Sequence, residues 1–138
     1  MLRTIFTIVS PLVLCGAISG CFVGSSGTDP TPVQPVGTLT TSWTLDGSDL
    51  ADDCAYYRID RVNVVLVDDY DDVIADEEPY CESFGLSFDL AVGWYTTEVT
   101  LLDQDGYAVS DTVVVTDIRV LRSAEVFVDV DFPDGAID

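Results

Sequence analysis

The densest group of potential ligand side chains is the acidic run Asp68-Asp69-Tyr70-Asp71-Asp72, which lies between two predicted strands. Carboxylate oxygens in a loop are the ligands that Ca²⁺ prefers, so the candidate metal ligands are Asp68, Asp69, Asp71 and Asp72. The second acidic turn, at residues 103–106, does not fit an EF-hand, because a loop beginning there would take Tyr107 as a ligand. A solvated hairpin turn is the alternative to calcium binding at the first run.

The usual catalytic groups are missing from the sequence. It has no His, and its five basic residues are all Arg, so a Ser or Cys nucleophile would have no conventional general base. No Asp-Thr-Gly or Asp-Ser-Gly segment of the aspartic-protease type occurs. Two carboxylates could hydrolyse a glycoside, but a small domain offers little cleft for a glycan. We predict that the protein is not an enzyme.

An apolar N-terminal segment contains Cys15 and ends at Cys21. One basic residue, Arg3, precedes an apolar stretch that runs from about residue 5 to residue 18. This is the layout of a secretory signal, and it is too short and too interrupted for a transmembrane helix, which needs roughly 20 predominantly apolar residues. The small residues Ser19-Gly20 before Cys21 suit a signal peptidase, whereas the bulky Leu14 before Cys15 does not.

The segment Ile18-Ser19-Gly20-Cys21 resembles the lipobox of bacterial lipoproteins. The resemblance implies that residues 1–20 are removed and that Cys21 receives a diacylglycerol and a further acyl chain such as palmitate. The membrane is then a partner of the protein through its N-terminal lipid. Because Phe22 rather than Asp follows the cysteine, the resemblance also implies the outer membrane of a Gram-negative bacterium. A plain cleaved signal, with Cys21 as a free thiol, and an uncleaved membrane anchor are the alternatives.

The remaining cysteines, Cys54 and Cys81, form an even pair in an exported domain. A disulfide is the expectation for such a pair. It would close a loop of about 28 residues and stabilise the domain by roughly 3–4 kcal/mol. A redox pair or a metal site is the alternative, but the sequence has neither Cys-x-x-Cys spacing nor His.

The charge of the chain restricts its partners. The net charge of −20 becomes −21 once Arg3 leaves with residues 1–20, so we expect no nucleic-acid binding, which requires clustered positive charge. The acidity favours the binding of cations or of a basic partner. Adaptation to a salty or cation-rich habitat is an equally good explanation. Tyrosines in or beside predicted loops could bind an unknown protein or glycan, although single exposed aromatic residues need no such explanation. They are Tyr56, Tyr57, Tyr70, Tyr80 and Tyr107.

Composition divides the chain into a signal peptide (residues 1–20), a lipid-anchored flexible linker (21–37) and one domain (38–138). The linker contains Gly24-Ser25-Ser26-Gly27 and three prolines, and as a loose coil it would span roughly 20–25 Å. The domain contains short runs that alternate apolar and polar residues, which predicts strands. The first strand should bury Leu39, Trp43 and Leu45. The last should turn Val126, Val128, Val130 and Phe132 inward.

Seven such runs, with no helical periodicity, predict an all-β, seven-stranded antiparallel Ig-like β-sandwich. The predicted runs are residues 39–45, 61–67, 73–75, 84–90, 94–102, 107–116 and 126–132. The Val-rich run 61–67 should be a central strand.

The segment Leu90-Ala91-Val92-Gly93-Trp94-Tyr95 has the form of a tyrosine corner, in which the tyrosine hydroxyl bonds to the upstream backbone. Residues 101–106 follow as an acidic-glycine hairpin turn. Together they resemble bacterial Ig-like and carboxypeptidase-regulatory-like domains over residues 88–132. That resemblance implies a fold and no activity. We therefore expect a non-enzymatic cell-envelope lipoprotein with a structural or binding role, or alternatively a calcium-dependent adhesion or sensing module.

Overall fold

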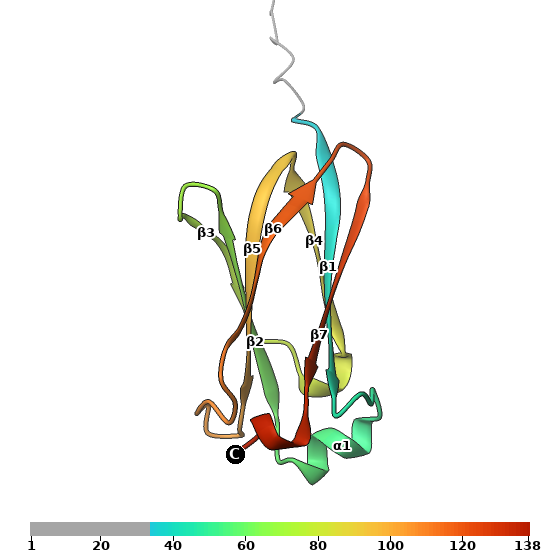
Figure 1. Ribbon diagram of the computed structural model, residues 1–138, viewed down its shortest axis with the longest axis vertical. Helices are drawn as coiled ribbons and strands as arrows, with labels where there is room; N and C mark the ends of the chain where they lie inside the picture. Colours follow the sequence, from blue (N-terminus) through green and yellow to red (C-terminus); the bar gives the residue numbers. More distant parts are fainter. Residues whose placement is uncertain (1–33) are drawn as a thin grey trace, which may run out of the picture. The chain divides into compact units, whose positions relative to one another are not determined.

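A computed structural model describes residues 34–138 (Figure 1). The predicted signal peptide, Cys21 and most of the predicted linker lie outside the described residues. The strands are β1 (Val36–Leu45), β2 (Arg61–Asp68), β3 (Val73–Glu77), β4 (Gly85–Ala91), β5 (Gly93–Leu102), β6 (Val113–Val120) and β7 (Glu125–Phe132). A six-residue helix, α1 (Ala51–Tyr56), and two 3₁₀ turns, η1 (Cys81–Ser83) and η2 (Asp134–Ala136), complete the domain.

The seven strands form two sheets, which Figure 1 shows as two facing layers. One sheet has the order β4-β1-β7 and the other has the order β3-β2-β5-β6. The predicted all-β class and the strand number are confirmed, and so is the central place of β2 between β3 and β5. The two layers enclose one core of buried side chains from both sheets.

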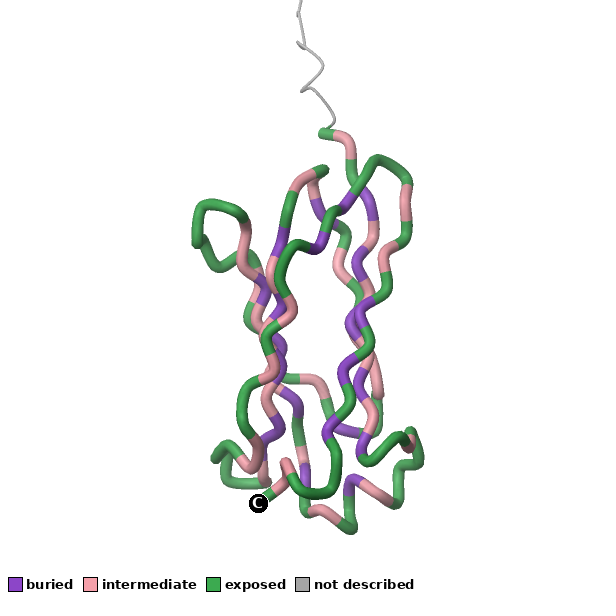
Figure 2. Tube along the Cα trace, viewed as in Figure 1, coloured by how far each residue is buried: buried purple, intermediate pink, exposed green. Residues whose placement is uncertain are grey.

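The side-chain alternation of the strands builds this core (Figure 2). Leu39, Trp43 and Leu45 of β1 are buried as predicted. In β7, Val128, Val130 and Phe132 are buried, whereas Val126 is only half-buried beside the core. Successive side chains of a strand point to opposite faces, so the intervening Phe127, Asp129 and Asp131 are exposed.

The tyrosine corner predicted between β4 and β5 is present. The Tyr95 hydroxyl donates a hydrogen bond to the Ala91 carbonyl oxygen at 2.9 Å. A side chain at Gly93 would contact the Tyr95 ring, since a Cβ there would lie 3.6 Å from it. The tight connection through Val92 therefore holds the two sheets together at this corner.

Two expectations about the fold are wrong. The sheets are not wholly antiparallel, because β1 pairs with β7 in parallel; alternation fixes the buried face of a strand but not its direction. A helix is present, α1, which is too short to show a helical period. β1 starts at Val36, two residues before the predicted start of the domain.

Smaller differences affect the later strands. Residues 107–112 lie in the connection before β6, which runs on to Val120 instead of ending at residue 116. Among residues 34–138, no helix is long and apolar enough to cross a bilayer.

Strand direction divides the domain into two ends. The first described residues, the β2–β3 turn, Val92 and the β6–β7 connection lie at one end, which we call the entry end. The opposite end, which we call the disulfide end, consists of residues 46–60, 78–84, 103–112 and 133–138. The connections at the disulfide end are longer, and α1, η1 and η2 all belong to it (Figure 1).

Candidate functional site

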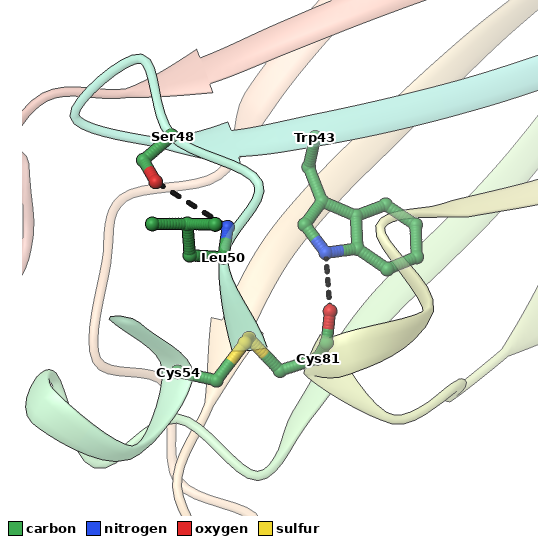
Figure 3. Close-up of a disulfide and its surroundings, with 5 residues drawn as sticks. All are labelled: Trp43, Ser48, Leu50, Cys54 and Cys81. Carbon is green, nitrogen blue, oxygen red and sulfur yellow. Dashed lines mark hydrogen bonds between the residues drawn. A yellow bond between two sulfur atoms is a disulfide. The ribbon is translucent and has the colours of Figure 1, made fainter. Parts of the chain in front are cut away.

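The predicted disulfide is present and holds the disulfide end together. Cys54 of α1 and Cys81 of η1 are bonded, with an S–S distance of 2.01 Å and a Cα–Cα distance of 6.0 Å. The buried Trp43 indole nitrogen donates a hydrogen bond to the Cys81 carbonyl oxygen at 3.0 Å (Figure 3). The β1–β2 connection, which is the longest of the domain, is thus bonded to η1 through the disulfide. The Trp43 hydrogen bond in turn joins η1 to the core strand β1.

Local backbone interactions place α1 across this end. The Ser48 hydroxyl oxygen accepts a hydrogen bond from the Leu50 amide at 3.3 Å just before the helix (Figure 3). Asp52 and Asp53 occupy the first turn, where negative charge suits the helix dipole. After the helix the backbone enters the left-handed region at Arg58, with φ of 59°. This reversal returns the chain to β2 and leaves the Arg58 side chain exposed.

Four of the five tyrosines that were considered as binding residues belong to the disulfide end. Tyr56 and Tyr57 pack edge-to-face, with ring centroids 4.9 Å apart. Tyr80 lies under the Arg61 guanidinium at 5.7 Å, and Tyr107 is exposed in the β5–β6 connection. Tyr70 lies apart from them, in the β2–β3 turn at the entry end.

Three open hollows adjoin the segment 58–60 at this end. One, of about 440 Å³, lies between α1 and the β5–β6 connection and is lined in part by Arg58, Asp103 and Gln104. A second, of about 450 Å³, is lined by Tyr56, Tyr57 and Arg58 together with C-terminal residues. The third, of about 390 Å³, lies beside Tyr80. Adjacent open hollows suit the side chains of a macromolecular partner better than one enclosed small molecule.

The electrostatics of the disulfide end are strongly negative. Arg58 is the one basic residue within the four segments of this end. The adjacent Arg61 of β2 is paired with Asp60 at 3.4 Å and with Glu78 at 3.6 Å. The carboxylates of the four segments are Asp46, Asp49, Asp52, Asp53, Asp60, Glu78, Glu82, Asp103, Asp105, Asp111, Asp134 and Asp138. Desolvation, assisted by the neighbouring Asp134 carboxylate, raises the pKa of Tyr57 to about 12.

The predicted calcium ligands of the β2–β3 turn do not converge on one point. One Asp68 carboxylate oxygen accepts hydrogen bonds from the Tyr70 and Asp72 amides, at 2.9 and 3.0 Å. Asp71 takes a left-handed conformation, with φ of 64°. Within residues 34–138, no group of three or more His, Cys, Asp or Glu side chains is placed to hold a metal ion.

The β5–β6 turn has the same construction. One Asp103 carboxylate oxygen accepts hydrogen bonds from the Asp105 and Tyr107 amides, both at 2.9 Å. Gly106, with φ of 82°, occupies the position that Asp71 has in the β2–β3 turn. In both turns the first aspartate therefore acts as an internal cap of the hairpin, and this structural role needs no cation. Calcium binding stays an untested prediction.

Comparison with known proteins finds no protein-family model that matches the chain and no similar curated protein.

Sequence reasoning missed part of the disulfide end. Arg58 and Asp134 join the tyrosines there, because α1 and η2 bring together residues that are far apart in the chain. No local pattern marks either residue.

Proposed function

We propose that the protein is a lipid-anchored protein of the bacterial cell envelope, whose single domain is a non-enzymatic binding module. Cys21 is the anchor, and the disulfide end is the surface that binds a cationic protein. The outer membrane is the proposed location, because Phe22 follows the lipid-bearing cysteine.

The difference between the two ends of the domain is the observation that carries this proposal. The chain enters at one end, and the long connections, the hollows and four tyrosines lie at the other. A protein tethered at the entry end can reach outward with the disulfide end. Tyrosine is a frequent interface residue, and clustered carboxylates favour a basic partner both in encounter rate and in specificity.

The strand order bears on the proposed family. Immunoglobulin constant domains place their first two strands in the same sheet, whereas β1 and β2 belong to different sheets here. We therefore favour the carboxypeptidase-regulatory-like resemblance over the Ig-like one. The tyrosine corner at Tyr95 and the aspartate-capped turn at Asp103 are compatible with both resemblances, so the preference rests on the strand order alone.

Site-specific photo-cross-linking in living cells tests the binding surface. A photo-reactive amino acid replaces Tyr56, Tyr80 or Tyr107 at the disulfide end, and replaces Tyr70 at the entry end as the matched control, since all four are exposed. We expect a discrete cross-linked protein from the three disulfide-end positions and none from position 70. Because the proposed contact is electrostatic, cross-linking in isolated envelopes should fall when salt rises from about 0.05 M to about 0.5 M.

Equal labelling from position 70 and from the disulfide end would contradict the proposed surface. Incorporation of labelled palmitate by a Cys21→Ser variant, or no incorporation by the wild-type protein, would contradict the anchor. The two results are separable, because the first concerns what the domain contacts and the second concerns how it is held.

A further inference from the structure

The entry end carries an exposed apolar surface that contains no carboxylate. Val36, Val92 and Leu121 are 51, 44 and 45 % exposed. The segments around them, residues 34–38, 91–94 and 118–124, contain no Asp or Glu, in a chain that has 25 of them. Charge exclusion of this kind is unexpected on a surface whose remainder is dominated by acidic residues.

Backbone hydrogen bonds join the three segments into one surface. The Val92 amide donates to the Pro35 carbonyl oxygen at 3.1 Å, and the Ser123 amide donates to the Val36 carbonyl oxygen at 2.8 Å. Gly37 is pressed against the Leu121 carbonyl oxygen, so closely that a Cβ there would lie 2.2 Å from it. We call Val36, Val92, Leu121 and Arg122 the entry patch.

Basic and aromatic side chains border the entry patch. Arg122 belongs to it and is exposed, and Arg119 lies over the Trp94 ring at 5.4 Å. These are two of the four Arg residues that follow Cys21. Arginine donates well to phosphate oxygens, and tryptophan is enriched at membrane–water interfaces.

The acidic groups near the patch define its limit. Asp68, Asp69 and Asp117 line a small hollow beside Trp94, so Trp94 marks one rim. Asp89 and Glu125 pair with Thr38, two residues after Val36, and mark the other. The β2–β3 turn also lies at the entry end. However, β5 separates β2 and β3 from β6, and Leu121 and Arg122 of the patch directly follow β6. Figure 1 shows this hairpin apart from the β6–β7 connection.

The chain that precedes the described residues joins the domain at this patch, because residue 34 leads directly into β1. Cys21 lies 13 positions before residue 34, and a flexible chain of that length has an end-to-end distance of about 20 Å. An anchor at Cys21 would hold the patch close to a bilayer, and tethering gives even a weak contact a high effective concentration.

We propose that the entry patch rests on the phospholipid surface, so that the domain is oriented as well as tethered. This inference depends on the lipid anchor of the proposed function. Val36, Val92 and Leu121 enter the boundary between headgroups and acyl chains, where exposed apolar side chains gain by burial. Arg122 and Arg119 donate hydrogen bonds to lipid phosphates. The disulfide end then points away from the membrane.

Tryptophan quenching by brominated lipid tests the contact. Residues 21–138 are coupled through the Cys21 thiol to a maleimide-bearing phospholipid in phosphatidylcholine vesicles; the other two cysteines are in the disulfide. Leu121→Trp in a Trp94→Phe background is the reporter. Leu50→Trp in the same background is the matched control, because Leu50 is also exposed but lies at the disulfide end. Buried Trp43 supplies a constant background.

Brominated acyl chains should lower the emission of the position-121 reporter at least about twofold and leave the position-50 control unchanged. Adding Val92→Asp and Arg122→Glu should abolish the quenching. A reporter at Val36 provides a second reading if the position-121 variant does not fold. Unquenched emission at both patch positions would overturn the inference and leave the patch available to a protein. Since the coupling is chemical, the result does not depend on whether cells acylate Cys21.

Discussion

Removing the disulfide should weaken the domain by about 3.5 kcal/mol. The bond joins residues separated by 27 positions, and the chain-entropy relation gives a loss of about 12 cal/mol/K for a loop of that length, or about 3.5 kcal/mol at 25 °C. The perturbation is the double variant Cys54→Ala, Cys81→Ala in a Cys21→Ser background. With a urea m-value of about 1.5–2 kcal/mol/M, the unfolding midpoint should fall by about 2 M.

Trp43 fluorescence in a Trp94→Phe background supplies the assay for this prediction. Its indole donates to the Cys81 carbonyl oxygen, so its emission reports both global unfolding and the packing of η1. Reduction of the Cys21→Ser protein in the same Trp94→Phe background is the matched control and should give a similar midpoint. A loss below about 1 kcal/mol would refute the reasoning, because the loop closed by Cys54 and Cys81 would then be ordered by its other contacts.

The remaining predictions concern single sites. Thr41→Val and Thr97→Val should each stabilise the domain by about 1 kcal/mol in urea unfolding, because both hydroxyls are fully buried and have no hydrogen-bond partner. Gly37→Ala should destabilise it by about 2 kcal/mol in the same assay, since the new methyl group would clash with the β6–β7 connection. Stability should fall as pH rises from 10 toward 12, because the unfolded state loses the Tyr57 proton first; Tyr57→Phe should flatten that slope in pH-dependent unfolding. Asp68→Ala should cost about 1 kcal/mol through loss of the turn cap, whereas millimolar Ca²⁺ should leave the wild-type midpoint unchanged. A calcium-dependent rise in the midpoint would contradict the structural account of this turn.

Patterns of neighbouring residues predicted much of the fold. Alternation identified the inward faces of β1 and β7, because a strand with one buried face must repeat every two residues. Tyr95 and its upstream partner Ala91 are only four residues apart, so the corner was visible as a motif. The disulfide followed from the even pair of cysteines in a domain predicted to be exported.

What could not be predicted depends on contacts between distant segments. The parallel pairing of β1 with β7 is one such feature, since no local pattern sets the relative direction of strands so far apart in the chain. Gly37 was assigned to the linker, because the sequence around it does not show why a small residue is needed. The reason is the close approach of Leu121, which is distant in sequence. The hollows beside Arg58 and the entry patch arise in the same way, from several connections that meet at one end.

Intact mass measurement of the protein extracted from membranes, with and without reduction, tests the central claim most directly. The account predicts the mass of residues 21–138 plus acyl chains, with a gain of two protons on reduction of the single disulfide. A mass that corresponds to an unlipidated chain would contradict the anchor at Cys21 and, with it, the proposed function.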